Sequence, residues 1–211
     1  MILETEIDGL LYSLDTDEQE AMVKECNYRW CKGEVTIPAS FFHEGIVYRV
    51  TSIGDHAFSD CGSLSSITIA EGVVSIGERA FSSCHNLTSI TVPKSVTSIG
   101  DNAFSDCSNL TAVHISSIKA WCKISFCNYT SNPLYYAHNL HLNGELIVEL
   151  IIPEGVTNIG DYTFCGCSSL TSITLPKGVT SIGKGAFNGY AFYYCTALTS
   201  INMPDSVKLI D

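Results

Sequence analysis

A unit of 23 residues recurs along the chain, and it constrains the fold more than any other feature of the sequence. Ile-Gly pairs stand at residues 53–54, 76–77 and 99–100, and again at 159–160 and 182–183. The aligned unit reads V-x-x-I-G-x-x-A-F-x-x-C-x-x-L-x-x-I-x-[IVL]-P. Self-similarity at a period of about 20–50 residues indicates stacked units that each contact only their neighbours. The sequence therefore predicts a repeat solenoid.

Each part of the unit predicts a local structure. In residues 87–92, Ile90 and Val92 alternate with Ser89 and Thr91, which is typical of a strand with one buried face. The A-F-x-x-C part predicts a short helical or 3-10 turn with Phe and Cys facing inward. The period and the Leu-x-x-Ile-x-Ile pattern fall in the leucine-rich-repeat range, so the predicted fold is a short right-handed leucine-rich-repeat superhelix.

Two further expectations follow from residues at fixed repeat positions. The Gly after each Ile is expected to adopt a turn conformation that other residues resist. The repeat phenylalanines are expected to stack as an aromatic spine: Phe58, Phe81, Phe104 and Phe164. One unit cannot bury its own apolar face, whereas stacked units can.

The repeat is interrupted in ways that divide the chain. Residues 1–48 lack it and predict a β-rich N-terminal cap, with strands expected in residues 7–14, 20–28, 33–39 and 46–50. Residues 49–211 predict the solenoid. Within it, residues 116–149 predict an irregular, elaborated coil, and Asn143-Gly144 predicts a hairpin turn there. A five-residue insertion falls near residues 188–192, and the last unit stops before its A-F-x-x-C part.

The chain has 10 cysteines, five of which share one repeat position. These five are Cys61, Cys84, Cys107, Cys167 and Cys195. Stacked strands lie about 4.8 Å apart, and side chains at equivalent positions run parallel and do not face each other. The spacing therefore favours buried free thiols that pack as small apolar groups, and a reducing or anaerobic setting.

Composition excludes several classes of partner. The formal net charge is −11, which argues against nucleic acid or an anionic membrane surface. No apolar run approaches the about 18 residues that a membrane span needs, so no membrane insertion by this segment is expected. Only 16% of residues are charged, against about 25% in an ordinary soluble domain. The polar surface must therefore come largely from Ser, Thr, Asn and Gly.

Two groups of Cys and His residues suggest catalysis or metal binding, but each has a simpler interpretation. His85 follows Cys84 directly, but His56 and His85 replace Asn or Ser of other repeats, as tolerant surface positions do. Cys122, Cys127, His138 and His141 spell C-x4-C-x10-H-x2-H, a residue mix that suits zinc but not its usual spacing. The sequence therefore predicts no enzyme, no catalytic residue, no cofactor and no metal site.

The units beginning at Val50, Val73 and Val96 share one order of motif, I-G-x-x-A-F-x-x-C-x-x-L, at constant spacing. This order resembles the BspA-like leucine-rich repeat family. The segments "DGLLYSLD" and "SNPLYYAHNLHLNGELIVELIIPEGVTNIG" are similar to the family as well, so the resemblance covers nearly the whole chain. It implies a bacterial cell-surface or secreted protein, in several cases an adhesin that takes part in host interaction. The residues of the motif occupy core positions, so the resemblance assigns no functional residue in this chain.

Candidate binding residues fall into two groups. Outward strand positions are expected to stack into a ladder of small polar groups, and solenoid sheets are extended recognition surfaces. Aromatic side chains gather in the irregular coil and in the insertion, and interface hot spots favour Trp, Tyr and Arg. The ladder candidates are Ser89, Thr91, His114, Ser172 and Thr174. The aromatic candidates are Trp121, Tyr129, Tyr135, Tyr136, Tyr190, Tyr193 and Tyr194. Ordinary sheet solvation and packing remain the alternatives for each.

The function predicted from these observations is non-catalytic. The leading hypothesis is a module of an adhesin-like protein that binds a host or neighbouring-cell protein or glycan. The alternative is a structural spacer, or a fragment of a longer repeat array, that presents another domain. Self-association through an uncapped C-terminal end is a further expectation.

Overall fold

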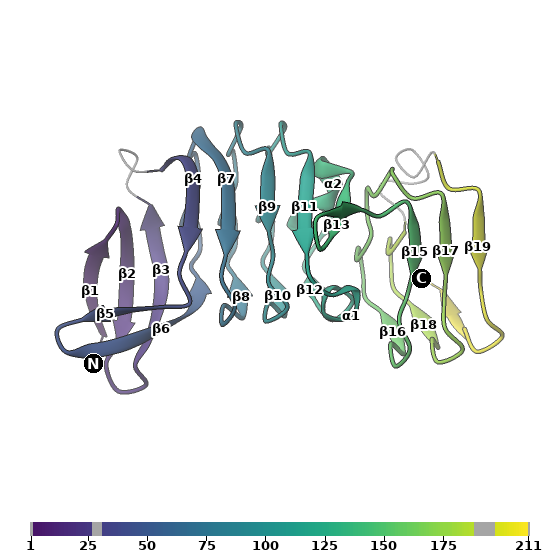
Figure 1. Cartoon of the computed structure of the whole chain (residues 1–211), viewed down its shortest axis with the longest axis horizontal. Helices are drawn as coiled ribbons and strands as arrows, with labels where there is room; N and C mark the ends of the chain where they lie inside the picture. Colours follow the sequence, from purple (N-terminus) through teal and green to yellow (C-terminus); the bar gives the residue numbers. More distant parts are fainter. Residues whose placement is uncertain (1, 27–30, 188–196, 211) are drawn as a thin grey trace.

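The computed structural model describes residues 2–26, 31–187 and 197–210. The chain forms a β-solenoid of about seven turns with few helices, so the predicted repeat solenoid is confirmed (Figure 1). None of the described helices has the length and apolar character needed to cross a membrane.

The N-terminal strands combine antiparallel hairpins with the first parallel pairs of the solenoid. Their bounds are β1 (Ile2–Ile7), β2 (Leu10–Asp15), β3 (Glu20–Cys26), β4 (Lys32–Ile37), β5 (Ser40–His43) and β6 (Ile46–Ile53). Strands β3 and β4 pair in parallel with β6 and β7, whereas β1–β2, β2–β3 and β5–β6 are antiparallel. Strands β1 and β5 are additional to the predicted ones. The β1–β2 hairpin covers the sheet edge that the parallel stack would otherwise leave open.

Each repeat contributes two strands, one more than the sequence predicted. The predicted strand of the Leu-x-x-Ile-x-Ile part is β7 (Ser63–Ile69), β9 (Ser89–Thr91), β11 (Ala112–Ile115), β15 (Glu149–Ile151), β17 (Ser172–Thr174) and β19 (Ser200–Asn202). The second strand precedes the repeat Gly in most turns and is two residues long. These strands are β8 (Ser75–Ile76), β10 (Ser98–Ile99), β12 (Ser125–Phe126), β16 (Asn158–Ile159), β18 (Ser181–Ile182) and β20 (Leu209–Ile210).

The strands form two separate stacks. The first stack, residues 2–146, holds an eight-stranded sheet that ends at β12 and a six-stranded sheet that runs from β4 to β14. The second stack, residues 149–210, holds two three-stranded sheets, β15-β17-β19 and β16-β18-β20. Figure 1 shows the ribbon of the sheet interrupted between β13 and β15. The interruption coincides with the predicted irregular coil.

The interrupting segment, residues 116–149, replaces a regular turn with short elements. These are α1 (Ile118–Trp121), β12 (Ser125–Phe126), the 3-10 turn η1 (Tyr129–Ser131), α2 (Leu134–Ala137), β13 (Leu140–Leu142) and β14 (Glu145–Leu146). Strands β13 and β14 pair antiparallel, with φ of 52° at Asn143 and 91° at Gly144. The predicted Asn-Gly hairpin is confirmed, because this turn needs positive φ at both residues.

The predicted reason for the repeat Gly, a turn conformation that other residues resist, is wrong. The glycines with positive φ lie elsewhere, and Gly77 and Gly100 are not among them. A Cβ on Gly100 would lie 2.6 Å from the backbone nitrogen of Glu78 and 2.7 Å from the carbonyl carbon of Gly77. Glycine is therefore required there because successive coils approach too closely for a side chain.

The A-F-x-x-C part forms hydrogen-bonded turns, with left-handed residues two and six positions after the repeat Gly. In one repeat these are Asn102 and Asp106, with φ of 53° and 61°. The buried rings stack as predicted, with centroids 5.1 Å apart for Phe58–Phe81 and 5.2 Å for Phe81–Phe104. In the second stack Phe164 stacks on Phe187 at 5.5 Å. The spine therefore exists in two parts, divided by the interrupting segment.

Candidate functional site

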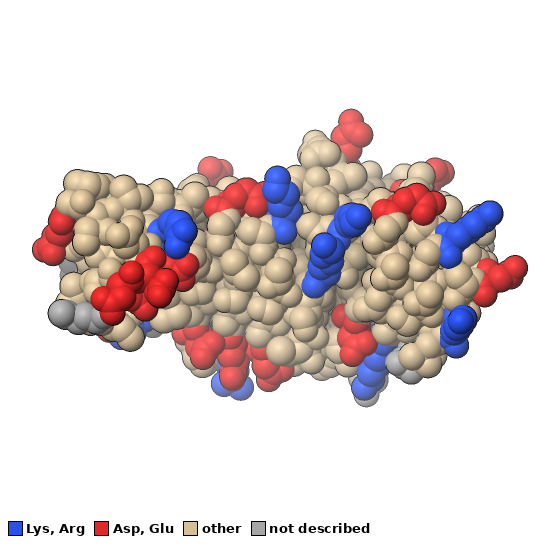
Figure 2. Space-filling view, turned by 90° about the horizontal axis from the view of Figure 1, so that it is seen from below, with Lys and Arg blue, Asp and Glu red and all other residues tan. Residues whose placement is uncertain are grey.

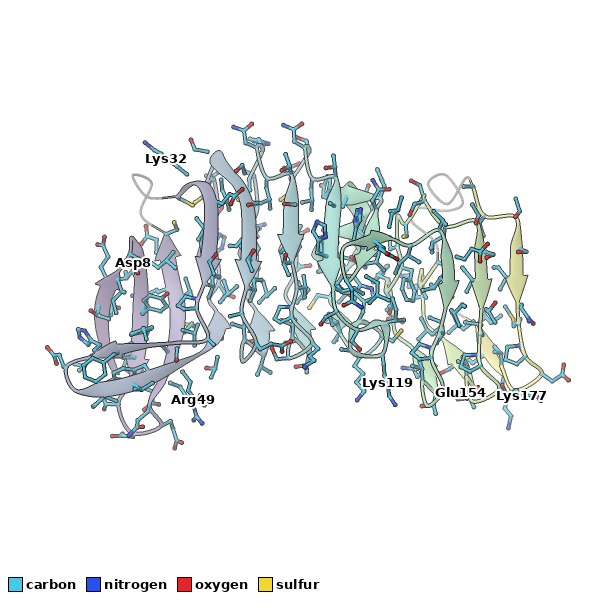
Figure 3. The ribbon with its side chains drawn as sticks, viewed as in Figure 1. Asp8, Lys32, Arg49, Lys119, Glu154 and Lys177 are labelled. Atoms are coloured by element: carbon cyan, nitrogen blue, oxygen red, sulfur yellow. The ribbon has the colours of Figure 1, made fainter. Side chains whose placement is uncertain are left out.

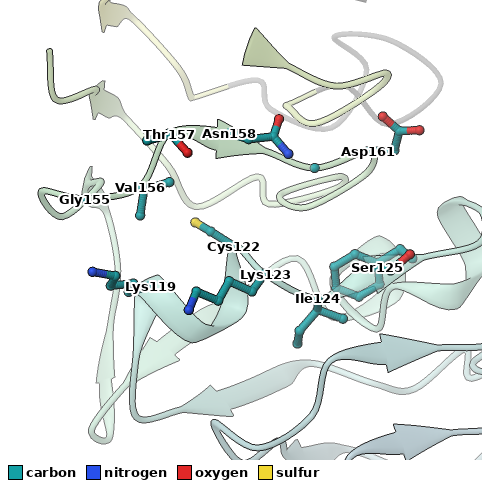
Figure 4. A pocket seen from close by; sticks show the side chains of 12 residues that line it. Lys119, Cys122, Lys123, Ile124, Ser125, Gly155, Val156, Thr157, Asn158 and Asp161 are labelled. Carbon is teal, nitrogen blue, oxygen red and sulfur yellow. The ribbon is translucent and has the colours of Figure 1, made fainter. Parts of the chain in front are cut away.

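A cleft lies where the two stacks are separated. One wall comes from α1 and β12, and the other comes from the turn before β16 and β16 itself. Its volume is about 390 Å³ (Figure 4). Polar and charged residues on its walls include Lys119, Lys123, Thr157, Asn158 and Asp161. We call this space the central cleft.

Local sequence explains why α1 forms at this wall. The Ser117 hydroxyl accepts a hydrogen bond from the Ala120 backbone N–H at 3.2 Å, which caps the helix. From the last residue of the helix, the Trp121 indole N–H donates to the Thr163 carbonyl oxygen of the second stack at 2.8 Å. Its ring packs on Phe126 with centroids 5.4 Å apart. Trp121 therefore ties the cleft wall to both stacks.

Trp121 does not serve as the surface contact that the sequence predicted. Its side chain is 1% exposed, so its ring has no face to offer a partner. Large aromatic residues dominate cores as well as interfaces, and a sequence pattern does not separate the two uses.

The two lysines of the cleft were not predicted as site residues. Both are exposed, and among the residues that the structure describes neither forms an ion pair. The Lys119 amine reaches the opposite wall, where its Nζ would lie 2.9 Å from a Cβ built on Gly155. Figure 4 shows the two lysine side chains on the same wall. The sequence signal was a capping Ser followed by lysines four residues apart in a chain with few charges.

The acidic residue of the cleft is already used in the fold. The Asp161 carboxylate accepts a hydrogen bond from the Lys184 backbone N–H at 2.9 Å, as Asp55 does from Glu78 at 2.7 Å one stack earlier. The cleft walls carry two lysine charges against the one charge of Asp161, so one positive charge is in excess. Because the chain carries a net charge of −11, this is a local exception.

The surface charge is distributed unevenly along the molecule. Figure 2 shows acidic side chains gathered over the N-terminal part, whereas most basic side chains of that face stand in its middle and towards the C-terminal part. Figure 3 shows Lys119, Glu154 and Lys177 in chain order along the edge that carries α1, β16 and β18. Charges further apart than about 8 Å are screened at physiological ionic strength. An anionic group in the cleft would therefore respond mainly to the nearby lysines.

The predicted tyrosines of the interrupting segment form a cluster. The Tyr129 and Tyr135 rings lie 4.9 Å apart, and Tyr135 meets Tyr136 edge-on at 5.0 Å. Tyr129 is 38% exposed, and the Tyr136 hydroxyl accepts from the Asp106 backbone N–H at 3.0 Å. Burial raises the pKa of Tyr136. The predicted Tyr190, Tyr193 and Tyr194, and the insertion at residues 188–192, lie outside the described residues.

The outward ladder forms within each stack but does not run the length of the molecule. Ser89 pairs with Ser66 and Ala112, and Thr91 pairs with Thr68 and His114. The second ladder places Ser172 and Thr174 between their partners on β15 and β19. Because the sheets end at β14 and restart at β15, the single flat ladder expected from the repeats is wrong.

The first ladder ends in a pair of histidines. His114 and His141 lie side by side on β11 and β13, with ring centroids 4.8 Å apart. Burial and the neighbouring His141 lower the pKa of His114. The Nδ1 atom of His141 is buried with no hydrogen-bond partner among the described residues.

The cysteines and histidines whose types suit zinc do not converge. Cys122 is buried at the cleft, where burial raises the pKa of its thiol to about 12, whereas Cys127 is exposed. The His138 ring contacts the Gly166 carbonyl oxygen through Nδ1 at 2.9 Å, and His141 stacks on His114. Among the described residues, these four side chains are therefore not gathered into one metal site.

The sequence matches a known family over most of its length. Residues 45–145 and 138–211 match, in six copies, a family described as BspA type leucine rich repeat region. No curated protein matches the chain in sequence.

Solved structures of bacterial leucine-rich repeat proteins resemble the fold. A Treponema pallidum leucine rich repeat protein superposes with a TM-score of 0.60 at 22% identity, over 99% of this chain and 86% of that one. A leucine rich cell surface protein from Faecalibacterium prausnitzii gives 0.59 at 31% identity, over 99% of this chain and 50% of its own. A Bacteroides ovatus leucine-rich repeat protein gives 0.57 at 27% identity, over 98% and 55%. This chain thus spans about half the length of the last two.

Proposed function

The chain belongs to the BspA-type leucine-rich repeat family, and we propose that it is a non-catalytic module that binds a protein or glycan at a cell surface. The observation that carries the proposal is the central cleft, because it combines a cavity of about 390 Å³ with two exposed lysines in an acidic chain. The Faecalibacterium prausnitzii relative is described as a leucine rich cell surface protein, which supports the proposed location.

The chemistry of the cleft favours a partner that carries a carboxylate or sulfate group. Lys119 and Lys123 would donate to such a group, and the Thr157 and Asn158 side chains offer further hydrogen bonds from the opposite wall. Acidic segments of proteins and acidic glycans share this chemistry. The tyrosines at 129, 135 and 136 are proposed as secondary contacts, and the outward ladders of the two stacks as a third surface.

The proposal is tested by binding to an array of matrix proteins and glycans at physiological salt. The double variant Lys119→Glu and Lys123→Glu should lose about tenfold in affinity for a specific hit, which corresponds to about 1.4 kcal/mol. The matched control is Lys94→Glu with Lys177→Glu, which makes the same charge change at exposed lysines away from the cleft. The control should bind as the parent chain does.

The variants that lose binding identify the surface that contacts the partner. A hit that both lysine variants keep, but that Tyr129→Ser with Tyr135→Ser loses, would move the contact to the tyrosine cluster. A hit that all of these variants keep would favour the outward ladders of the two stacks.

A structural spacer is the second candidate function. It is favoured by the coverage of two relatives, since 99% of this chain matches only 50% of the Faecalibacterium prausnitzii protein. A folded chain that binds nothing on the array would support the spacer over the binding module. Self-association remains a prediction, which light scattering of the purified chain would test.

A further inference from the structure

Three cysteines meet where the N-terminal strands join the first repeat. Cys26 ends β3, Cys31 directly precedes β4, and Cys61 occupies the repeat position after β6. Their sulfur atoms all lie within 4.8 Å of one another, and each side chain is no more than 3% exposed. Figure 3 labels Lys32, the first residue of β4, at this end of the molecule. We call these residues the thiol cluster.

The equivalent cysteines of later repeats are arranged differently. The Cys84 thiol donates to the Phe58 carbonyl oxygen at 3.1 Å, and the Cys107 thiol donates to Phe81 at 3.1 Å. Each of these thiols thus uses the backbone of the preceding repeat. Cys61 is the first in the column, and where a preceding repeat would stand it meets two cysteines from outside the repeat pattern. The Cys26 backbone N–H donates to the Ala57 carbonyl oxygen at 2.7 Å, which fixes this junction.

We propose that Cys26, Cys31 and Cys61 bind a soft, thiophilic divalent cation of the zinc class. Sulfur ligands select such ions over magnesium or calcium, which prefer oxygen. A zinc–sulfur bond of about 2.3 Å in a tetrahedral site places ligand sulfurs about 3.8 Å apart. The thiol cluster meets that spacing with small adjustments, and the fourth position is left to solvent or to a small ligand.

The electrostatics of the cluster favour a cation. A bound cation would displace the thiol protons of the cluster, because sulfur ligates zinc as the thiolate. Glu25 and Asp60 are acidic neighbours of Cys26 and Cys61 that add to the negative potential.

A surface hollow lies beside the thiol cluster. Cys26 lines a surface hollow of about 420 Å³ together with Glu25, Asp55, His56 and Asp60. Acidic side chains at such an entrance raise the local concentration of cations. The hollow thus places three acidic side chains and one basic side chain, Lys24, next to Cys26.

The cation would join three segments that only the fold brings together. It would connect the end of β3, the start of β4 and the turn of the first repeat. Structural metal sites stabilise small or terminal units in this way, because the folded state alone assembles the ligands. The proposed site does not depend on the binding function assigned to the central cleft.

The test is a zinc titration of the whole chain, purified anaerobically and freed of reductant. One equivalent should bind per chain, and zinc should raise the thermal midpoint. Cys31→Ala should weaken zinc binding by more than about 100-fold, since even outer-shell changes cost about 10- to 100-fold. The matched control is Cys127→Ala, which removes an exposed thiol away from the cluster and should leave the affinity unchanged.

A second measurement needs no variant. Zinc should slow alkylation of Cys26, Cys31 and Cys61 in the unmodified chain, as mapped by peptide mass spectrometry, and a chelator should restore it. The proposal is overturned if no equivalent of zinc binds, if the three thiols react equally with and without zinc, or if Cys127→Ala alone removes binding. A Cys26–Cys31 disulfide in the anaerobic protein would overturn it as well.

Discussion

The regular repeats between Val50 and Ile115 and the interrupting segment at residues 116–149 bury their side chains in different ways. The regular repeats bury identical residues at identical positions, so rings, thiols and small polar side chains form columns. The interrupting segment extends the sheets of the first stack through β12 and β13, but it breaks the column of phenylalanine rings. Its interior is held by contacts that do not recur along the chain, such as the hydrogen bond from the Trp121 indole N–H to the Thr163 carbonyl oxygen.

The difference shows where a solenoid can acquire a site. Within a column, the buried rings and thiols meet their own kind one repeat away. Where the column is broken, side chains from two stacks face each other and a cleft becomes available. Three predictions test this contrast, from the largest expected effect to the smallest.

Removing a ring from the regular column should cost most. Phe81 is fully buried between Phe58 and Phe104, so Phe81→Ala should lower the free energy of unfolding by about 3–5 kcal/mol. Chemical denaturation would measure the loss. Phe42→Ala is the matched control, because Phe42 is 69% exposed on β5, and its effect should stay within about 0.5 kcal/mol. Equal losses in both variants would contradict the idea of a cooperative column.

Removing a single hydrogen bond from the interrupting segment should cost less. Trp121→Phe keeps an aromatic ring but removes the indole donor to the Thr163 carbonyl oxygen, which still accepts from the Asn132 side chain at 3.0 Å, and should cost about 0.5–1.5 kcal/mol. Tyr136→Phe is the control within the same segment. It removes a hydroxyl that accepts from Asp106 at an exposed turn, where water can replace it. If the control loses as much as Trp121→Phe, the indole contact does not join the stacks.

The smallest effect concerns pH at the boundary between the two regions. The pKa of His114 is lowered by burial and by His141, so the unfolded chain takes up this proton more readily than the folded one. The neutral His114 side chain therefore contributes its full stabilisation of the folded state above the pKa of about 6.5 that histidine has in the unfolded chain. This stabilisation is lost as pH falls below that value. His114→Thr restores the residue type of Thr68 and Thr91 and should flatten that acid slope.

Unfolding midpoints measured between neutral and mildly acidic pH would test this change of slope. His85→Thr, at an exposed turn, serves as the control and should leave the slope as in the parent chain. An unchanged slope in His114→Thr would show that the histidine pair does not couple protonation to folding.

The sequence predicts the regular region well because the same pattern of residues recurs in every repeat. The strand at Ser89–Thr91, the buried Cys84 and the stacked Phe81 follow from period and alternation alone. The repeat glycine was interpreted as a turn residue, whereas Gly100 is needed for the close approach of the next coil. That distance depends on how coils stack, which local patterns do not encode.

The candidate site was less predictable for the same reason. Trp121 and Tyr129 belong to one aromatic-rich segment, yet one is buried and the other is 38% exposed. Lys119 and Lys123 carry no motif, and they became candidates only when their wall was seen to face Gly155. Cys26 and Cys31 stand outside the repeat, and their meeting with Cys61 depends on the parallel pairing of β3 with β6 and of β4 with β7.

The sequence by itself determined that this protein is a solenoid, which residues of each repeat face its core, and where the repeat fails. It could do so because short-range periodicity dictates which faces of a strand or turn are apolar. Only the tertiary structure decided that the sheets separate into two stacks, that a cleft with two lysines lies between them, and that three cysteines converge at the first repeat. Those features arise from contacts between residues distant in the chain, and no local pattern records which distant residues will meet.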